Sequence, residues 1–173
     1  MTHAKKLLVV VDMQRDFIDG ALGTAEAQAI LPAVRARIAA ARAAGEAVVF
    51  TRDTHGKDYL ATQEGKRLPV PHCIEGEVGW QLAEGLAAAG ERCFDKPCFG
   101  SVALGGYVRE AGFAAVELIG VCTDICVISN ALLIKAFCPE AAVSVRASCC
   151  AGVTPHSHET ALAAMRACQI DIV

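Results

Sequence analysis

The sequence has no long hydrophobic run and no excess of positive charge. Its longest apolar stretches, such as residues 7–11, are far shorter than the roughly 20 residues that a membrane-spanning helix needs. Lysine and arginine together number 16 against 19 acidic residues, so the formal net charge is −3. Nucleic-acid-binding proteins rely on a basic field that this chain lacks. We therefore expect neither a membrane nor a nucleic acid as the partner of this protein.

Three familiar motifs are also missing. No signal-peptide pattern occurs at residues 1–6, which lead directly into a strand-like segment, so no secretory leader is expected. No pair of cysteines has the CxxC spacing of a structural zinc site. No GxGxxG, GKS or GKT pattern follows the first predicted strand, so no nucleotide cofactor is expected.

Cysteine, in contrast, is abundant. The chain has 173 residues and nine cysteines, an odd number, and most of them lie among apolar residues. Such a distribution favours buried free thiols in a reducing compartment over the disulfide framework of a secreted protein. We therefore predict a cytoplasmic location.

Composition and periodicity predict the fold. Hydrophobic residues make up 54% of the chain and charged residues 20%, which is typical of a globular protein. The length fits one domain, predicted to span residues 1–173. Short β-branched runs alternate with alanine-rich stretches, which indicates an α/β fold: a three-layer α/β/α sandwich with a mostly parallel six-stranded sheet. The strands are predicted at residues 7–11, 47–51, 92–94, 115–121, 142–147 and 170–173.

Capping signals predict where two of the helices begin and end. Pro32 suits the first turn of a helix that Gly45 would terminate in a left-handed conformation. Thr154 suits the N-cap of the last helix, because a proline follows it. His156 and His158, in the first turn of that helix, are expected on the surface. Its apolar stripe is predicted to contain Leu162, Met165 and Cys168.

Polar residues stand where several predicted strands end. Asp12 follows the strand at 7–11, Lys96 follows the strand at 92–94, and Cys126 follows the strand at 115–121. Ligands of doubly wound sheets bind beyond the carboxyl ends of the strands, so these three side chains could converge on one rim. Taken singly, each has an ordinary explanation, as a turn residue, a solvated lysine and a core thiol.

The predicted position of Cys126 adds chemical meaning to this group. Thr123 as an N-cap would place Cys126 in the first turn of a helix over residues 124–137. Free N–H groups and the helix dipole lower the pKa of a thiol there. The N–H groups of Cys122 and Cys126 could also hold an oxyanion. Asp12 would then supply a base and Lys96 a cation that orients it.

Four segments carry a resemblance to a known family. DMQRDF, the DTH that ends the second predicted strand, DKPCFGS and GVCTDICV resemble the isochorismatase-like cysteine hydrolases, most closely the nicotinamidases, over essentially the whole chain. In that family an aspartate, a lysine and a cysteine form the catalytic set, which implies Asp12, Lys96 and Cys126. The resemblance also implies a cis peptide bond between Val121 and Cys122. Isochorismatases proper commonly lack the cysteine, so Cys126 favours the amidase branch.

A second group of residues lies in the stretch 53–79, which is too long and too aperiodic for an ordinary connection. Asp53 and His55 share one side of an extended segment, and Glu64 and His72 lie further along. Imidazole and carboxylate groups suit zinc, iron or manganese, although such residues are also frequent in loops. The resemblance implies a divalent metal ion, first of all zinc, held by Asp53, His55 and His72, with Glu64 completing the set as in some family members.

The resemblance implies hydrolysis of a small carboxamide, nicotinamide before others, through a cysteine thioester. Phe17 and Phe99 are candidate walls for a flat ring, because each lies a few residues beyond a catalytic position. In the family an aromatic residue often precedes the metal histidine, whereas this chain has Pro69 and Val70, so another small amide or a ureido compound stays open. A metal-binding or redox-sensing protein without turnover is the alternative from another class.

Two further expectations concern association and the reactivity of the thiols. Small enzymes of this family usually associate, and the apolar composition leaves surface for a partner to cover, so a homo-oligomer is expected. An activated Cys126 should also be the fastest of the nine cysteines to react with iodoacetamide at neutral pH. Production of nicotinate would connect the protein to NAD salvage, a setting that the sequence leaves open.

Overall fold

The computed structural model describes residues 5–173. The expectation that no leader precedes the first strand rests in part on residues 1–4, which lie outside the described residues. Six strands are present: β1 Lys6–Val11, β2 Ala47–Asp53, β3 Arg92–Lys96, β4 Ala115–Val121, β5 Ala142–Ala151 and β6 Asp171–Ile172. The helical segments are α1 Arg15–Ile18, α2 Ala25–Ala43, η1 Tyr59–Ala61, α3 Val102–Ala111, η2 Thr123–Val127, α4 Ile128–Phe137 and α5 Pro155–Ala167.

The strands form one sheet in the order β3-β2-β1-β4-β5-β6, and every neighbouring pair is parallel. All six predicted strands are therefore confirmed. Strands β2 and β3 extend further than predicted, so that Asp53 is the last residue of β2 and Lys96 the last residue of β3. Strand β5 also continues beyond residue 147, to Ala151. The polar residues at the strand ends consequently share the carboxyl edge of the sheet.

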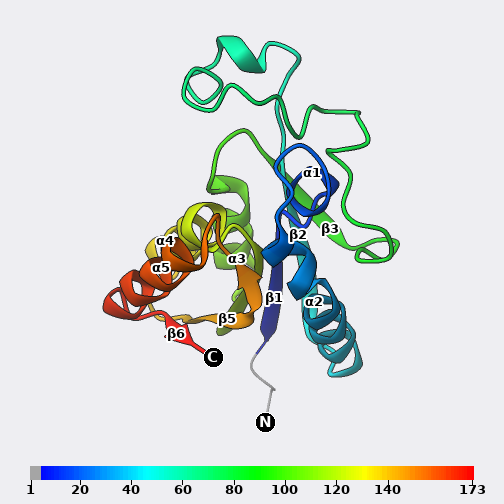
Figure 1. Ribbon diagram of the computed structural model, residues 1–173. Coiled ribbons are helices and arrows are strands. Elements are labelled where there is room, and N and C mark those ends of the chain that lie inside the picture. Colours follow the sequence, from blue (N-terminus) through cyan, green and yellow to red (C-terminus); the bar gives the residue numbers. More distant parts are fainter. Residues whose placement is uncertain (1–4) are drawn as a thin grey trace.

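Helices cover both faces of the sheet, as Figure 1 shows, with α2 on one side and α3, α4 and α5 on the other. The alternation of side chains along β1 explains the layers. Leu7, Val9 and Val11 pack into the core beneath α3, α4 and α5, whereas Leu8 and Val10 pack into the core beneath α2. A strand buried on both faces reads as a continuous apolar run, and this gives the predicted three-layer α/β/α arrangement.

The predicted start of α2 is wrong. The helix begins after Thr24, whose side chain accepts a hydrogen bond from the Ala27 N–H at 3.0 Å, and Pro32 lies inside it. An exposed proline removes a single backbone hydrogen bond, which the N-cap and the buried face of α2 outweigh here. Gly45 has a φ of +70° just past the helix, as predicted.

The prediction for α5 is confirmed at its start and partly wrong at its end. The Thr154 side chain accepts a hydrogen bond from the Ser157 N–H at 3.1 Å, so Thr154 is the N-cap. Leu162 and Met165 are buried, but Cys168 is exposed because the helix already ends there.

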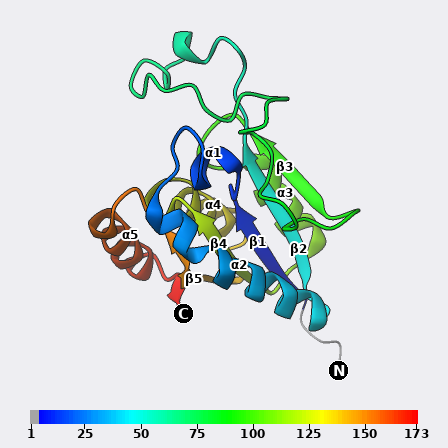
Figure 2. The same ribbon diagram turned by 45° about the vertical axis from the view of Figure 1, so that its right-hand side comes forward.

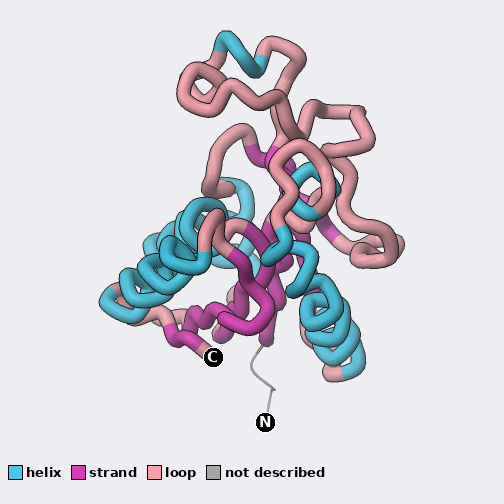
Figure 3. The backbone as a smooth tube through the Cα atoms, viewed as in Figure 1, coloured by secondary structure: helices cyan, strands magenta, loops and turns pink. Residues whose placement is uncertain are grey.

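Residues 54–91 connect β2 to β3 and contain only the short helix η1. The first part of this segment projects beyond the carboxyl edge of the sheet, and the later part returns beside the strands, as the two orientations of Figures 1 and 2 show. Most of it is irregular chain, drawn as pink tube in Figure 3. An isolated bridge of Gln14 with Leu82 attaches the segment to the rim, and one of His55 with Ile74 lies within the segment. Within residues 5–173, no helix combines the length and the apolar character that crossing a membrane would take.

Candidate active site and metal group

The structure brings Asp12, Lys96 and Cys126 together at the carboxyl edge of the sheet. Lys96 Nζ lies 2.7 Å from Asp12 Oδ2 and 3.4 Å from Cys126 Sγ. All three residues are buried, and Cys126 is only 4% exposed. A cation, a carboxylate and a thiol therefore share one enclosed space.

The backbone directs the Asp12 carboxylate toward this space. Asp12 follows β1 directly and has a φ of +48°, which turns the chain out of the sheet. The Thr51 hydroxyl donates to Asp12 Oδ1 at 2.6 Å, so Oδ2 is the oxygen that faces Lys96. Oδ2 accepts no hydrogen bond of good geometry from the described residues, although Lys96 Nζ is close to it. That oxygen can therefore accept a proton.

The turn that carries Cys126 differs from the predicted helix. Thr123 does not cap an α-helix over residues 124–137. Instead η2 is a wider turn, in which the Val127 N–H donates to the Cys122 carbonyl five residues back at 3.0 Å, and α4 begins at Ile128. The Thr123 hydroxyl pairs with His158 Nδ1 on α5 at 2.8 Å, so His158 supports this turn and is not a free surface residue.

Backbone N–H groups lie at the start of the same turn. The Val121–Cys122 peptide bond is cis, as the resemblance implies. Among residues 5–173, the Cys122 N–H donates to no protein acceptor. The Cys122 carbonyl accepts hydrogen bonds from the N–H groups of Ile125 and Val127, but not from the N–H of Cys126. The start of η2 thus offers donors to a bound oxygen atom.

The electrostatics of Cys126 differ from the expectation. Burial, followed by the negative charge of Asp12, raises the pKa of the Cys126 thiol well above its ordinary value, and Lys96 opposes this only in part. The prediction that the helix end lowers the pKa of Cys126 is therefore wrong for the free protein. The expectation that Cys126 reacts fastest with iodoacetamide at neutral pH loses its basis as well. Burial also raises the pKa of Asp12, against the effect of Lys96. Because its pKa is raised, the Asp12 carboxylate is a stronger base than an ordinary aspartate, and this suits it to exchange a proton with the neighbouring thiol.

The pKa of Lys96 is raised despite burial, because Asp12, Cys126 and Asp53 favour its charged form. Lys96 is consequently protonated at neutral pH. It is the cation that compensates the carboxylates of this site.

Asp53, His55, Glu64 and His72 form a second cluster beside the first. Each offers one ligand atom, and the four atoms lie within 4.8 Å of one another. The Asp53 Oδ2 atom is 3.0 Å from His55 Nε2 and 3.5 Å from His72 Nε2, and Glu64 Oε1 is 3.7 Å from both nitrogens. Ligands of a tetrahedral zinc ion are separated by about 3.3 Å, given metal–ligand distances near 2.0 Å. The four side chains therefore fit a divalent metal ion.

Neighbouring groups hold the two histidine rings in place. His72 Nδ1 lies 2.8 Å from the Val70 carbonyl, which leaves Nε2 facing the cluster. The Tyr59 ring packs against both imidazoles, with centroids 4.7 Å from His55 and 5.0 Å from His72. The Tyr59 hydroxyl donates to the Leu68 carbonyl at 2.9 Å. Outer contacts of this kind orient metal ligands, and the sequence had not indicated Tyr59 for that role.

Asp53 belongs to both clusters. Its Oδ2 atom faces the histidines, and its Oδ1 atom accepts a hydrogen bond from Lys96 Nζ at 3.0 Å. Burial opposes ionisation of Asp53, but hydrogen bonds to His55 and His72 and the charge of Lys96 outweigh it, so the pKa of Asp53 is lowered. The ionised carboxylate of Asp53 thus connects two sets of residues: the metal group, which consists of Asp53, His55, Glu64 and His72, and the thiol site, which consists of Asp12, Lys96 and Cys126.

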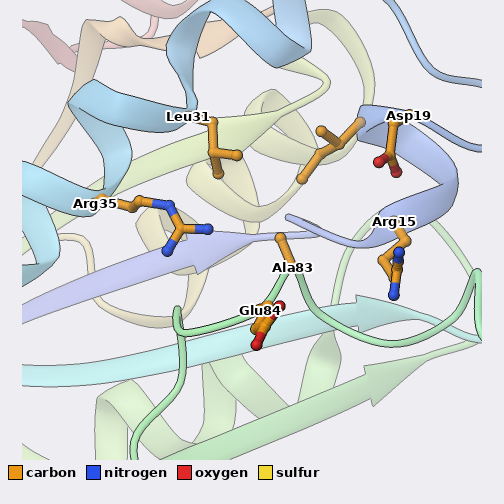
Figure 4. Close-up of a pocket in the computed structure, with 7 residues that line it drawn as sticks. Arg15, Asp19, Leu31, Arg35, Ala83 and Glu84 are labelled. Atoms are coloured by element: carbon orange, nitrogen blue, oxygen red, sulfur yellow. The ribbon is translucent and has the colours of Figure 1, made fainter.

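The two predicted ring walls occupy different environments. Phe17 is buried, and its ring lies edge-on to His72 with centroids 5.6 Å apart. Phe99 is 39% exposed. A surface hollow of about 190 Å³, shown in Figure 4, lies elsewhere and contains none of the predicted site residues. It is lined by Arg15, Ile18, Asp19, Leu31, Arg35, Ala83 and Glu84.

Comparison with known proteins assigns the family. Residues 6–173 match the family model of the isochorismatase domain. The chain belongs to the isochorismatase family. The match covers all six strands and every residue of both clusters, so the site described above lies within the family's domain.

Similar members of the isochorismatase family include proteins with named activities. The nicotinamidase/pyrazinamidase of Mycobacterium tuberculosis is 28% identical over 185 residues, covering 97% of this chain and 98% of the relative. A structure of the pyrazinamidase of Pyrococcus horikoshii in complex with zinc has 29% identity and a TM-score of 0.87, with 98% of each chain covered. The pyrazinamidase/nicotinamidase of Streptococcus mutans has 28% identity and a TM-score of 0.87, covering 98% of this chain and all of that one (100%).

Proposed function

We propose that this protein is an amidohydrolase that converts a small carboxamide, first of all nicotinamide, to the carboxylate and ammonia. The contact of Lys96 with both Asp12 and Cys126 in a buried space carries the proposal. Similarity to nicotinamidase/pyrazinamidases along nearly the whole chain supports the substrate class.

Cys126 acts as the nucleophile in this mechanism. Its sulfur attacks the amide carbon while Asp12 takes the thiol proton, and the same proton then passes to the leaving nitrogen, so that ammonia departs and a thioester remains. Water, deprotonated by Asp12, attacks the thioester and releases the carboxylic acid and the thiol. The raised pKa of Asp12 suits this role, because burial makes its carboxylate a stronger base than an ordinary aspartate.

Backbone and lysine stabilise the charges that develop. The N–H groups of Cys122 and Cys126 would bind the oxyanion of the tetrahedral intermediate. Lys96 keeps Asp12 ionised and oriented through the 2.7 Å contact with Oδ2. Its charge also lies close enough to Cys126 Sγ to favour the thiolate during attack.

Asp53, His55, Glu64 and His72 would hold a divalent ion, which we infer to be zinc, with iron and manganese as alternatives. When bound, the ion supplies a Lewis-acid contact for the ring nitrogen of a pyridine amide and so helps to position the substrate. Phe17 beside His72 and the exposed Phe99 would bracket the ring.

This role of the metal makes a testable distinction. Removing the ion with a chelator should raise the KM of nicotinamide and pyrazinamide more than that of an acyclic amide, because only the ring substrates use the ion for positioning. Re-addition of zinc should restore the lower KM. An equal loss for both kinds of substrate would contradict the positioning role.

The decisive experiment measures ammonia release from nicotinamide, pyrazinamide, benzamide and N-carbamoyl compounds. Wild-type protein is compared with Cys126→Ala and with Cys150→Ala, which changes another buried cysteine outside the site. Release that disappears only in Cys126→Ala supports both the reaction and the nucleophile. Turnover of a different amide would keep the mechanism and change the substrate. If zinc-loaded protein released no ammonia from any compound of the panel, a metal-binding or redox-sensing protein without turnover would be favoured.

The setting of the protein is inferred from its thiols and its surface. All nine cysteines are free, which favours the reducing cytoplasm. Val102 and Leu132 are exposed apolar side chains that a second copy could cover in a homo-oligomer. Light scattering coupled to size-exclusion chromatography tests whether the protein forms a homo-oligomer. Nicotinate as the product would separately link the protein to NAD salvage.

A further inference from the structure

One buried polar side chain beside the active site has no part in the proposed mechanism. Gln14 is 0% exposed, and the three hydrogen bonds of its side-chain amide all go to backbone groups. Its Oε1 accepts the Asp53 N–H at 2.7 Å, and its Nε2 donates to the Asp53 carbonyl at 2.8 Å. The second Nε2 hydrogen goes to the Trp80 carbonyl at 2.9 Å.

The sheet explains why Asp53 needs this partner. Strand β1 ends at Val11, but β2 continues to Asp53. In a parallel pair the N–H and the carbonyl of one residue face the same neighbouring strand. The Thr54 N–H bonds to the Lys96 carbonyl on the β3 side, so the two groups of Asp53 face the side that β1 has left. The side-chain amide of Gln14 takes the place of the missing peptide group.

The backbone of Gln14 brings its amide to this place. The Gln14 N–H donates to the Asp12 carbonyl at 2.7 Å, which closes a tight turn directly after β1. Gln14 also forms the bridge with Leu82, in the returning part of residues 54–91. The same side chain is therefore fixed against the sheet on one side and against the long connection on the other.

We propose that Gln14 is a positioning residue, which fixes the backbone of Asp53 so that one carboxylate serves the metal group and Lys96 at the same time. Asp53 Oδ2 lies 3.0 Å from His55 Nε2, while Oδ1 lies 3.0 Å from Lys96 Nζ. A rotation of Asp53 that improved one contact would lengthen the other. This inference rests on the proposed function, because it takes the two clusters as parts of one site.

The test uses two variants of Gln14 and one matched control. Gln14→Met keeps the length of the side chain and removes every hydrogen bond. Gln14→Glu keeps the shape and an acceptor but loses both donors. Val34→Ala, in the core beneath α2, destabilises the protein without touching Asp53. Zinc-loaded proteins are compared well below their melting temperatures, so that folding losses do not enter the readouts.

Two readouts need no substrate: the zinc dissociation constant, by competition with a chromophoric chelator, and the rate at which iodoacetamide alkylates Cys126. Both Gln14 variants should bind zinc about tenfold more weakly or worse, as loss of an outer-shell partner does. They should also alkylate several-fold more slowly, because Lys96 loses one of its anchors. Val34→Ala should match the wild type in both.

The proposal would be overturned if the Gln14 variants bound zinc and reacted with iodoacetamide as the wild type does and differed from it only by a lower melting temperature. If Gln14→Met does not fold, Gln14→Glu decides by the same readouts, and failure of both to fold would assign Gln14 a purely structural role. A wild-type protein that hydrolyses no amide, while the variants behave as expected, would refute the proposed function and leave the positioning role standing.

Discussion

Replacing Lys96 by methionine removes the charge at the centre of the site and keeps a side chain of similar length. Among residues 5–173, Lys96 is the only lysine or arginine within ion-pair distance of Asp12 or Asp53. Neither carboxylate has appreciable access to water to compensate for its loss. The substitution therefore leaves two buried negative charges without their cation.

The expected loss of stability is large. Removing one partner of a buried ion pair costs about 3–5 kcal/mol, because the remaining charge stays desolvated. Asp12 keeps the hydroxyl of Thr51, and Asp53 keeps the imidazole of His55, which limits the additional cost of the second carboxylate. We expect the free energy of unfolding to fall by about 3–5 kcal/mol near neutral pH, a considerable part of the roughly 5–15 kcal/mol of an ordinary domain.

The loss should depend on pH. Burial raises the pKa of Asp12 in the folded protein, and Lys96 opposes this rise, so the variant's Asp12 has a still higher pKa. A group with a raised folded pKa contributes stability that is present below its unfolded pKa of 3.8 and is lost as pH rises toward the folded value. The deficit of the variant should therefore grow with pH, by up to about 1.4 kcal/mol per pH unit for this group.

Urea unfolding of metal-free protein at about pH 5 and about pH 7.5 measures both effects. Lys66→Met is the matched control, because Lys66 is exposed and its loss should change little. A deficit for Lys96→Met below about 1 kcal/mol, the range of a surface pair, would refute the reasoning. So would a deficit that is equal at the two pH values.

Two further predictions concern the thiol and the metal group. Because burial and Asp12 raise the pKa of Cys126, iodoacetamide should modify the exposed Cys98 and Cys168 before Cys126 at neutral pH. It should reach Cys126 faster as pH rises, and Asp12→Asn should speed that reaction. Peptide mapping across a pH series checks this, and an early adduct on Cys126 in the wild type would contradict it. Tyr59→Phe removes the hydrogen bond to Leu68 but keeps the ring on both histidines, so stability should fall by about 1 kcal/mol with zinc affinity unchanged. Chemical denaturation and chelator competition separate the two quantities, and weaker zinc binding would mean that the hydroxyl itself orients the ligands.

The sheet was predictable because burial on both faces leaves a strong local signal in the strands. Helix starts were less predictable where two local signals competed. Thr24 and Pro32 both suit the start of a helix, and the threonine prevails because the apolar face extends back to Ala27. The turn at Thr123 was not predictable from local signals, because its hydroxyl is engaged by His158, which lies far along the chain.

The residues of the site could be found from their places at strand ends, but not their electrostatics. The direction of the Cys126 pKa depends on how deeply the thiol is buried and on the charge of Asp12 beside it, and neither is visible in a helix-capping pattern. Gln14 escaped notice for another reason. Its partners are the backbone groups of Asp53 and Trp80, which carry no residue-type signature.

The origin of the site residues along the chain has a consequence for diversification and redesign. Asp12, Lys96 and Cys126 come from the ends of β1 and β3 and from η2, whereas three of the four metal-group residues come from residues 54–91. Under the proposed mechanism, the bond-breaking residues and most of the metal ligands are thus encoded in separate stretches, and Asp53 contacts both groups. Transplanting the projecting segment from another family member should exchange ligand preference while retaining the hydrolytic machinery, provided that the graft begins after this shared carboxylate.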